Sequence, residues 1–218
     1  MPSRRQTPRS VQSRASRWRL ASTTALATTA VALASWLEPV TAAPSVSDLV
    51  GTWSTGSGAV LTGPAFGIPY NNSFASPAVA GYSFSFTEDG YFEQAQFTWN
   101  SNATHHNCIE AVEIWQHGNY TLHSNGSITT DPTVFPGDGR IKVQNACAAT
   151  TTQIYYYSEP ALYLNYQVAD WRGKDMLRFA QFDGQLMPRM FLVSRDPSQY
   201  MFPTEYITNT STGTFVID

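Results

Sequence analysis

The sequence consists largely of short runs in which apolar and polar residues alternate, separated by turns that contain glycine. In GYSFSFTEDGYFEQAQF the aromatic residues occupy every second position up to Phe86, a turn is centred on Gly90, and the apolar phase resumes at Phe92. A period of two places alternate side chains on one face of a strand, and such a turn joins two strands into a hairpin. No segment has the period of a convincing amphipathic helix.

The segment QHGNYTLHSNGSITT repeats this pattern with the same offsets. Leu122 and Ile128 can lie on one face only if the loop between them has an odd number of residues. This predicts a three-residue loop with Gly126 in the left-handed conformation. In the same register Asn119 and His123 point outward, so the polar density of the segment does not require an active site.

Two later segments extend the pattern. Every second residue of PALYLNYQVAD from Leu162 to Val168 is apolar, and DMLRFAQFDGQLMPRMFLV turns at Asp183-Gly184. Short strands with turns every ten to fifteen residues predict an all-β fold, an antiparallel meander closed as a lipocalin-like barrel, with a β-sandwich as the alternative. Gly51-Thr52-Trp53 resembles the opening of lipocalin-type barrels, in which the Trp closes one end. The region from 64 to 77, rich in Pro and Gly, is predicted to be a long loop at one end of the barrel.

The first 42 residues have the features of a secretory signal peptide. Six arginines precede any acidic residue, the apolar stretch LASTTALATTAVALASWL follows, and Val40-Thr41-Ala42 offers small residues for cleavage. A transit peptide and an uncleaved signal anchor are the alternatives. We predict a signal peptide over 1–42, an antiparallel β domain over 43–200 and a tail containing Ser and Thr over 201–218, which lacks the apolar run of a membrane anchor.

Cleavage of this leader would leave 7 basic and 15 acidic residues, a net charge of −8. A chain of this charge is repelled by a phosphate backbone and by an anionic membrane surface, so nucleic-acid binding is not expected. No G-x-x-x-x-G-K-[ST] loop is present to hold a nucleotide, and we predict no cofactor.

A chain that enters the secretory pathway can form disulfides between its cysteines and can be glycosylated at its asparagines. In an oxidising compartment Cys108 and Cys147 are expected to form a disulfide, and closing a loop of about 40 residues would stabilise the fold by about 4 kcal/mol. Five asparagines lie in the N-x-[ST] acceptor pattern and are the predicted glycosylation sites: Asn71, Asn102, Asn119, Asn125 and Asn209.

Catalytic and metal sites find little support. A glycoside hydrolase needs two facing carboxyl groups, and the candidates are Glu88, Asp89, Glu93, Glu110 and Glu113. No pair stands out: Asp89 occupies a turn, and the odd spacing of Glu110 and Glu113 puts them on opposite faces of a strand. We therefore predict no catalytic residue and no enzymatic activity.

A metal site is not expected either. His105, His106 and Cys108 could supply ligands, but the thiol is assigned to the disulfide and no second cluster has zinc spacing. His117 and His123 are predicted to be solvated.

Aromatic residues allow a third function, carbohydrate binding. Trp53, Trp99, Trp115 and Trp171 could stack on sugars, although packing in the core is the expected role of Trp53 and Trp99. The run Tyr155–Tyr157 is left open, because three consecutive rings cannot all face inward on a strand.

Five segments, in order, carry a resemblance to a known family: LVGTWSTGSGAVLTGPAF, YSFSFTEDGYFEQA, FTWNSNATHHNC, QHGNYTLHSNGSIT and FAQFDGQLMPRMFLV. Over residues 48 to about 195 the chain resembles the fungal reversal-of-TOR-lethality (Rot-one) family. The resemblance implies a chaperone of the endoplasmic reticulum that assists folding of secretory and glycosylation-pathway proteins and is required for cell-wall β-1,6-glucan assembly. Family members are glycoproteins with a C-terminal membrane anchor, so membrane association is expected from the family but not from the tail of this chain.

The expected partners are unfolded or immature secretory proteins, other endoplasmic-reticulum chaperones and cell-wall synthesis proteins. Candidates for the client surface are Phe66, Tyr70, Tyr155, Tyr156 and Tyr157, which lie where a regular strand would not bury every aromatic ring. The predicted chaperone acts in the lumen without ATP. The alternatives are a carbohydrate-binding module and a cell-wall glycoside hydrolase.

Overall fold

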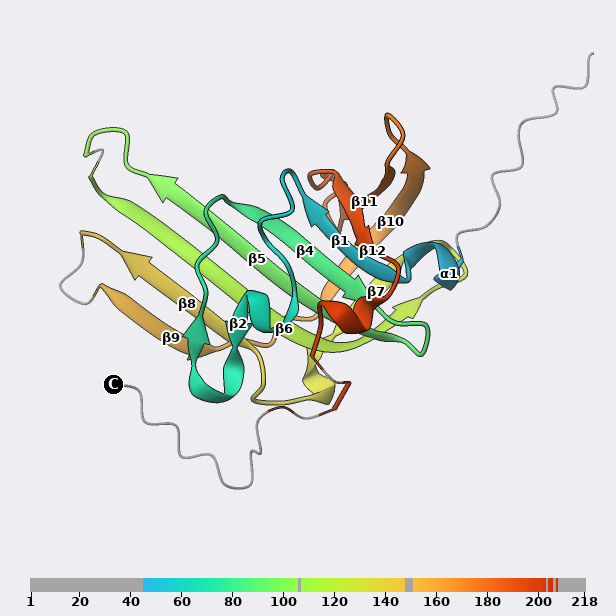
Figure 1. The fold of residues 1–218 in the computed structure, drawn as a ribbon, viewed down its shortest axis with the longest axis horizontal. Coiled ribbons are helices and arrows are strands. Elements are labelled where there is room, and N and C mark those ends of the chain that lie inside the picture. The colour runs from blue at the N-terminus through green and yellow to red at the C-terminus, as the bar shows by residue number, and fades with distance from the viewer. Residues whose placement is uncertain (1–44, 106, 148–150, 203, 206, 208–218) are drawn as a thin grey trace, which may run out of the picture. The chain divides into compact units, whose positions relative to one another are not determined.

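The structure is a computed structural model that describes residues 45–105, 107–147, 151–202, 204–205 and 207 (Figure 1). Nearly all regular structure in this part of the chain is antiparallel β, which confirms the predicted class. The strands are β1 Gly51–Thr55, β2 Gly67–Ile68, β3 Ser73–Phe74, β4 Gly81–Phe86, β5 Tyr91–Ser101, β6 Ile109–Leu122, β7 Ile128–Asp131, β8 Arg140–Asn145, β9 Thr152–Tyr156, β10 Ala161–Asp170, β11 Asp175–Gln181 and β12 Met190–Ser194. The helical elements are α1 Val46–Leu49 and the 3₁₀ turns η1 Gly63–Ala65, η2 Pro69–Asn71, η3 Pro132–Val134 and η4 Pro197–Gln199.

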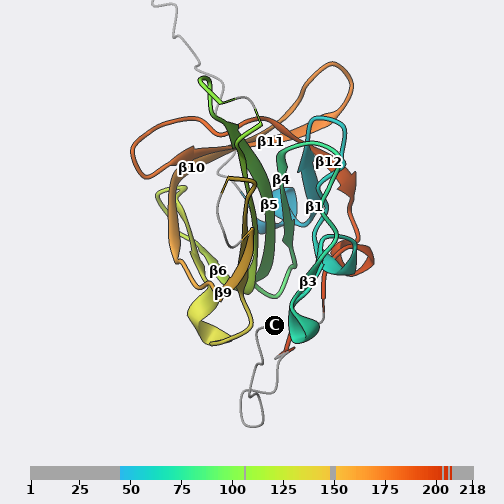
Figure 2. The ribbon, with the colours of Figure 1, turned by 90° about the vertical axis from the view of Figure 1, so that its left-hand side faces the viewer.

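Eight of these strands form a closed ring of hydrogen-bonded neighbours, in the order β5-β4-β1-β12-β11-β10-β7-β6 and back to β5. The long strand β6 pairs with β7 near its C-terminal end and with β8 along its N-terminal half, so β8 and then β9 extend from the ring. In Figure 2, β10, β6 and β9 lie on one side and β1, β12 and β3 on the other, with β4 and β5 between them. We call β8 and β9 the arm.

Three hairpins of the ring share one turn geometry, as the sequence predicted for two of them. In the β6–β7 hairpin His123 N donates to Ser127 O at 2.9 Å, Leu122 lies opposite Ile128, and Gly126 has a φ of 84°. The β4–β5 turn at Gly90 and the β11 turn at Gly184 have the same hydrogen bonds and a positive φ. Glycine adopts this conformation without the steric cost that a side chain would add. The predicted loop of odd length is confirmed.

The interior of the ring holds the larger apolar core, to which all eight strands contribute. Phe179 of β11 lies at its centre, with ring centroids 5.5 Å from Phe84, 6.0 Å from Phe86 and 4.6 Å from Tyr163. Trp53 is fully buried, and its Nε1 donates to Leu49 O of α1 at 2.7 Å. These edge and stacked contacts add to the burial of large aromatic surfaces.

The face of β10 differs from the alternation expected between Leu162 and Val168. A bulge shifts the β10–β11 register between Tyr163 and Asn165, so that Tyr163 and Tyr166 are both buried. Leu162 and Leu164 are exposed instead. An extra residue on one strand reverses the phase beyond it, which period-two reasoning on the sequence could not locate.

A second, smaller core lies on the outer face of β5 and β6. Ala95, Phe97 and Trp115 pack there against Val60 and Phe66, with Phe74 and Phe202 at the margin. The region 64–77 was predicted to be a long loop at one end, and this is wrong: it forms η1, β2, η2 and β3 and covers the outer face of the sheet. Among the described residues, no helix has the length and apolar content needed to cross a membrane.

Candidate functional site

The arm places two of the predicted surface tyrosines in solvent. Consecutive side chains of a strand point to opposite faces, and Tyr155 and Tyr156 are accordingly exposed on both, at 48% and 56%. Tyr157 is partly buried. Burial and the nearby Glu159 carboxylate raise the pKa of the Tyr157 hydroxyl.

The other two candidates for the client surface lie in the segment that covers β5 and β6. Tyr70 in η2 is exposed, but Phe66 is only 1% exposed and belongs to the smaller core. We therefore remove Phe66 from the candidate surface. The run of Pro and Gly around Phe66 suggested a loop, and only the position of this segment against β5 and β6 shows why the ring is buried.

An apolar patch at the start of β10 and in the turn after β11 was missed from the sequence. Leu162, Leu164, Phe182 and Leu186 are exposed, and Phe182 reaches 74%. They are neighbours because Tyr163 pairs with Gln181 and Ala180 bridges to Leu186. The available signal was Phe182 itself, an aromatic residue directly before the Asp183-Gly184 turn, where an inward position is not expected.

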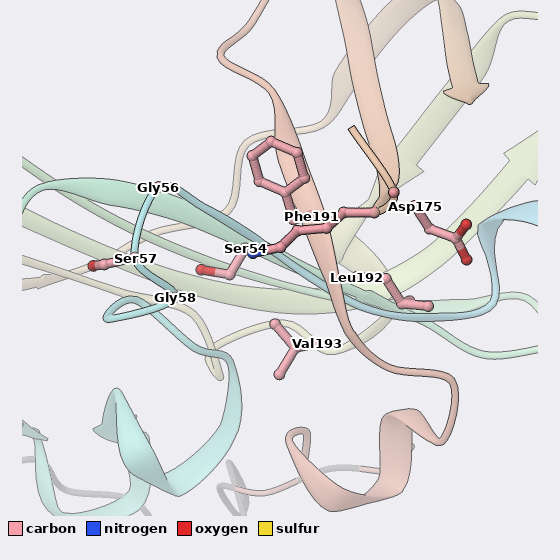
Figure 3. Close-up of a pocket in the computed structure, with 10 residues that line it drawn as sticks. Ser54, Gly56, Ser57, Gly58, Asp175, Phe191, Leu192 and Val193 are labelled. Carbon is pink, nitrogen blue, oxygen red and sulfur yellow. The ribbon is translucent and has the colours of Figure 1, made fainter. Parts of the chain in front are cut away.

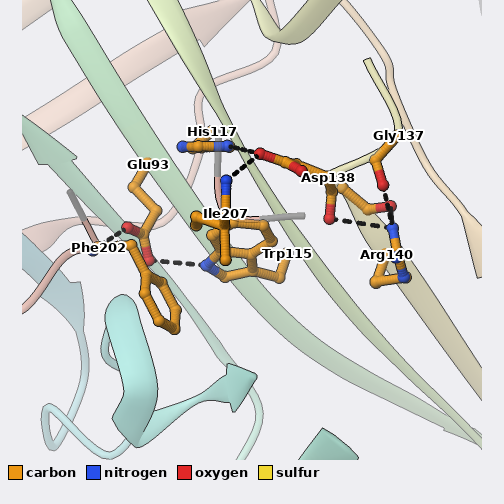
Figure 4. Close-up of polar contacts among 9 residues, drawn as sticks. Glu93, Trp115, His117, Gly137, Asp138, Arg140, Phe202 and Ile207 are labelled. Atoms are coloured by element: carbon orange, nitrogen blue, oxygen red, sulfur yellow. Dashed lines mark hydrogen bonds and ion pairs between the residues drawn. The ribbon is translucent and has the colours of Figure 1, made fainter. Parts of the chain in front are cut away.

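Opposite the ring interior, the outer face of β5 and β6 carries buried polar groups (Figure 4). Glu93 is fully buried and accepts hydrogen bonds from Trp115 Nε1 and Phe202 N, both at 2.7 Å, and from Gly63 N. Burial raises the pKa of Glu93 to about 7, although the three hydrogen bonds favour the ionised form. The carboxyl group thereby joins η1, β6 and the chain at Phe202.

His117 belongs to the same face, two residues beyond Trp115. Its Nε2 lies 2.9 Å from Asp138 Oδ2, which also accepts from Ile207 N at 2.9 Å. The side chain of His117 is 3% exposed and its ring stacks on Phe135 at 4.5 Å, so the prediction that it is solvated is wrong. His123 is exposed, as predicted.

Two cations of β8 complete the network. Arg140 donates from Nε to Asn72 Oδ1 at 2.7 Å, and Lys142 Nζ lies 2.8 Å from Glu113 Oε2. Burial lowers the pKa of Arg140. Across the network, hydrogen bonds of Gly63 and Asn72 hold the segment after β1 to the sheet, and those of Phe202 and Ile207 hold the segment after β12. These charged groups therefore have a structural role.

The carboxylates considered for glycoside hydrolysis do not form a facing pair. Glu88 and Asp89 are exposed in the β4–β5 turn, and Glu110 is exposed and accepts from Asn145 Nδ2 at 3.2 Å. Glu113 lies on the opposite face of β6, as its odd spacing from Glu110 predicted.

The cysteines form the predicted disulfide, with 5.2 Å between the Cα atoms of Cys108 and Cys147. The bridge joins the residue before β6 to the segment that connects β8 and β9. His105 is exposed, and His106 lies outside the described residues. The described part of the chain contains no group of three or more His, Cys, Asp or Glu side chains arranged to hold a metal ion.

Four of the predicted glycosylation sites lie on the surface. Asn71, Asn102, Asn119 and Asn125 are exposed, and Asn209 lies outside the described residues. In three of them the Asn Oδ1 accepts from the hydroxyl two residues later, at 2.6 Å for Asn71, 2.7 Å for Asn102 and 2.7 Å for Asn125. Asn119 lies within β6 on its outward face.

The tryptophans divide into two groups. Trp53 and Trp115 are buried, whereas Trp99 and Trp171 are exposed. The expectation that Trp99 packs in the core is wrong: it lies near the end of β5, where the β5–β6 hairpin extends past the region covered by β4, and it is 51% exposed. Trp171 is partly covered by Arg189, whose guanidinium carbon lies 4.1 Å from the ring centroid.

An open groove of about 510 Å³ lies beside β1 and β12 (Figure 3). Two of its polar side chains have partners: Ser54 Oγ donates to Val60 O at 2.5 Å, and Asp175 binds Arg195 Nη2 at 2.7 Å. The remaining lining consists of Ser57, Lys174, three glycines and the apolar residues Phe191–Val193. Within the described residues, this groove holds no set of three or more possible metal ligands.

Comparison with known proteins gives a consistent result. Residues 49–215 match a family model, Rot1, described as a fungal chaperone for protein folding within the endoplasmic reticulum. The chain is 40% identical over 190 residues to Protein rot1 of Sclerotinia sclerotiorum, covering 86% of this chain and 70% of that protein. It is 38% identical over 175 residues to Protein ROT1 of Meyerozyma guilliermondii, covering 78% and 71%. No solved structure gives a significant match.

Proposed function

We propose that this chain holds unfolded secretory proteins in the lumen of the endoplasmic reticulum without ATP. The chain belongs to the fungal Rot1 family of chaperones for protein folding within the endoplasmic reticulum. In this proposal the leader over 1–42 directs the chain into the secretory pathway and is removed. Glycans are carried by the exposed acceptors Asn71, Asn102, Asn119 and Asn125 and by Asn209.

Exposed apolar side chains on the arm, at the start of β10 and in the turn after β11 carry the proposal. Tyr155, Tyr156, Leu162, Phe182 and Leu186 are all more than two-fifths exposed. A group of apolar side chains on a surface marks a site for binding other proteins. An unfolded client that binds there is withdrawn from aggregation by mass action, and this needs no nucleotide.

The sequence supports the part of the proposal that concerns ATP. The chain has no G-x-x-x-x-G-K-[ST] loop to hold a nucleotide. We propose that the requirement for β-1,6-glucan assembly is indirect and arises from folding of cell-wall synthesis proteins, which are clients. Other chaperones of the compartment are proposed as partners in the same folding steps.

The exposed Trp99 supports a second candidate, carbohydrate binding at the end of the β5–β6 hairpin. An exposed ring can stack on a sugar face. Trp99→Ala should then abolish retention on a β-glucan column while leaving aggregation suppression unchanged.

Aggregation of a chemically unfolded protein tests the chaperone proposal. The glycosylated chain, secreted from a eukaryotic host, is added at increasing ratios without nucleotide, and light scattering is followed. We expect scattering to fall as the ratio rises and ATP to make no difference. Unchanged scattering at a severalfold excess of this chain, or suppression that requires ATP, contradicts the proposal.

A further inference from the structure

Strand β9 is the outer edge of the sheet within the part of the chain that the structure describes. Thr151 O accepts from Asn145 N at 2.9 Å, and Tyr157 N donates to Gly139 O at 3.0 Å, so both residues direct their main-chain groups toward β8. In an antiparallel pair the N–H and C=O of one residue point to the same side, and this side alternates along the strand. The N–H and C=O of Thr152 and Ile154 therefore point away from β8, to the outer edge.

In the described part of the chain, this edge lacks the charge, the proline and the bulge that often protect a free strand. Proteins discourage pairing at an edge by charged side chains, proline, bulges or a covering element. β9 has the sequence TQIYY, with no charge and no proline, and its five pairs with β8 are in continuous register. By contrast, β10 contains a bulge.

The side chains of β9 place little restriction on the sequence of an added strand. Four of its five side chains are exposed, on both faces of the strand. The side chains of an added strand would therefore point into solvent or lie beside the ring of Tyr155. Main-chain hydrogen bonds would be the contacts that hold the strand. Recognition of this kind gives affinity without requiring a particular sequence.

We propose that β9 binds an extended segment of an unfolded polypeptide by β-strand addition, with hydrogen bonds to Thr152 and Ile154. The inference rests on the chaperone function proposed above and names the place and the mode of client binding. The charge of the chain narrows the class of segment. Glu110 and Glu159 are exposed near the two ends of β9, so segments without acidic residues are favoured.

Amide hydrogen exchange tests the contact directly. The ¹⁵N-labelled wild-type chain is compared with and without a reduced, carboxymethylated polypeptide that cannot refold. We expect exchange at Thr152 and Ile154 to slow by about tenfold at saturation, while Gln153, whose N–H faces β8, changes little. If exchange at these amides slows as the concentration of this chain alone is raised, a second copy of the chain binds the edge. If both amides are fully protected in the isolated chain, another segment of the same chain covers the edge. Either result overturns the proposal.

A proline on the edge provides the functional test. Ile154→Pro removes an outward N–H but no bond to β8, a position at which edge strands tolerate proline. We expect it to raise about tenfold the concentration needed for half-suppression of aggregation, with the melting temperature little changed. The control Ile154→Thr keeps the N–H and should suppress as the wild type does. If Ile154→Pro fails to fold, Thr152→Pro replaces it.

The outcomes separate this proposal from the function on which it rests. A wild-type chain that does not suppress aggregation contradicts the chaperone proposal itself. A wild-type chain that suppresses, together with a folded proline variant that suppresses equally well, leaves the function intact and overturns the assignment to β9.

Discussion

The ring and the arm are built from the same kind of strand, yet they differ in what each strand contacts. Every ring strand has a hydrogen-bonded neighbour on both sides, and Phe179 at the centre of the core is surrounded by aromatic rings. Among the described strands, β9 of the arm pairs with β8 alone, and most of its side chains are exposed. The ring therefore accounts for stability, and the arm together with the apolar patch at the start of β10 and after β11 offers surface for binding.

A matched pair of phenylalanines on one hairpin tests this difference most strongly. Phe179 is fully buried and Phe182, three residues later, is 74% exposed. Phe179→Ala should destabilise the fold by about 3–5 kcal/mol, because it removes a large side chain from a packed core. Phe182→Ala should change the free energy of unfolding by less than about 0.5 kcal/mol. Urea denaturation measures both, and equal losses would contradict the distinction.

The pH dependence of stability tests the polar layer on the outside of the ring. Burial raises the pKa of Glu93 from 4.5 to about 7, so the folded state binds a proton more tightly than the unfolded state. The contribution of Glu93 is therefore most favourable below about pH 4.5 and is lost as the pH rises through 7, by roughly 3 kcal/mol in total.

Glu93→Gln isolates this effect from that of other titrating groups. Between pH 5 and pH 8 the free energy of unfolding should fall less in the variant than in the wild type, because the variant lacks the contribution of Glu93. It should also be less stable than the wild type at pH 5, because an amide NH₂ would face the Phe202 N–H that now donates to Glu93 Oε2. Unfolding free energies of both proteins at the two pH values provide the measurement. Parallel pH profiles would show that Glu93 does not titrate in this range.

The turn of the β6–β7 hairpin offers a smaller effect within the ring. Gly126 has a φ of 84°, a conformation that β-branched residues rarely adopt. Gly126→Val should destabilise the fold by about 1–3 kcal/mol. Thermal unfolding measures the loss, with Gln167→Val at an exposed position of β10 as the control. An unchanged melting temperature for Gly126→Val would contradict the turn geometry.

The arm should show the smallest effect on stability and the largest on binding. Tyr155→Ser removes a ring that is about half exposed, so we expect the free energy of unfolding to change by less than about 0.5 kcal/mol. Suppression of client aggregation should weaken in the same variant. If stability falls by more than about 1 kcal/mol instead, Tyr155 is a packing residue and the arm resembles the ring.

Local sequence patterns predicted the hairpins because alternation and turn glycines act over a few residues. The register of Leu122 with Ile128 and the positive φ of Gly126 followed from parity alone. The bulge after Tyr163 could not be predicted in this way. An extra residue in β10 depends on how this strand pairs with β11, and the residues around Tyr163 give no local sign of that pairing.

The second layer outside the ring was the main feature that sequence reasoning missed. Glu93, Ala95 and Phe97 share one face of β5, opposite the face of Phe92, and both faces therefore carry apolar residues. That pattern is typical of a strand covered on both sides. It could have indicated that His117, on the matching face of β6, is buried, but not which segment covers it.

Crosslinking in intact cells, from one position in the arm and one in the ring, tests the central claim that the arm binds client proteins. A photoreactive residue replaces Tyr155 in one variant and Glu88, exposed in the β4–β5 turn of the ring, in the other, and captured molecules are identified after irradiation of intact cells. The account predicts a varied set of immature secretory proteins from position 155 and few from position 88. Equal capture from both positions, or recovery of glucan without protein from position 155, would contradict it.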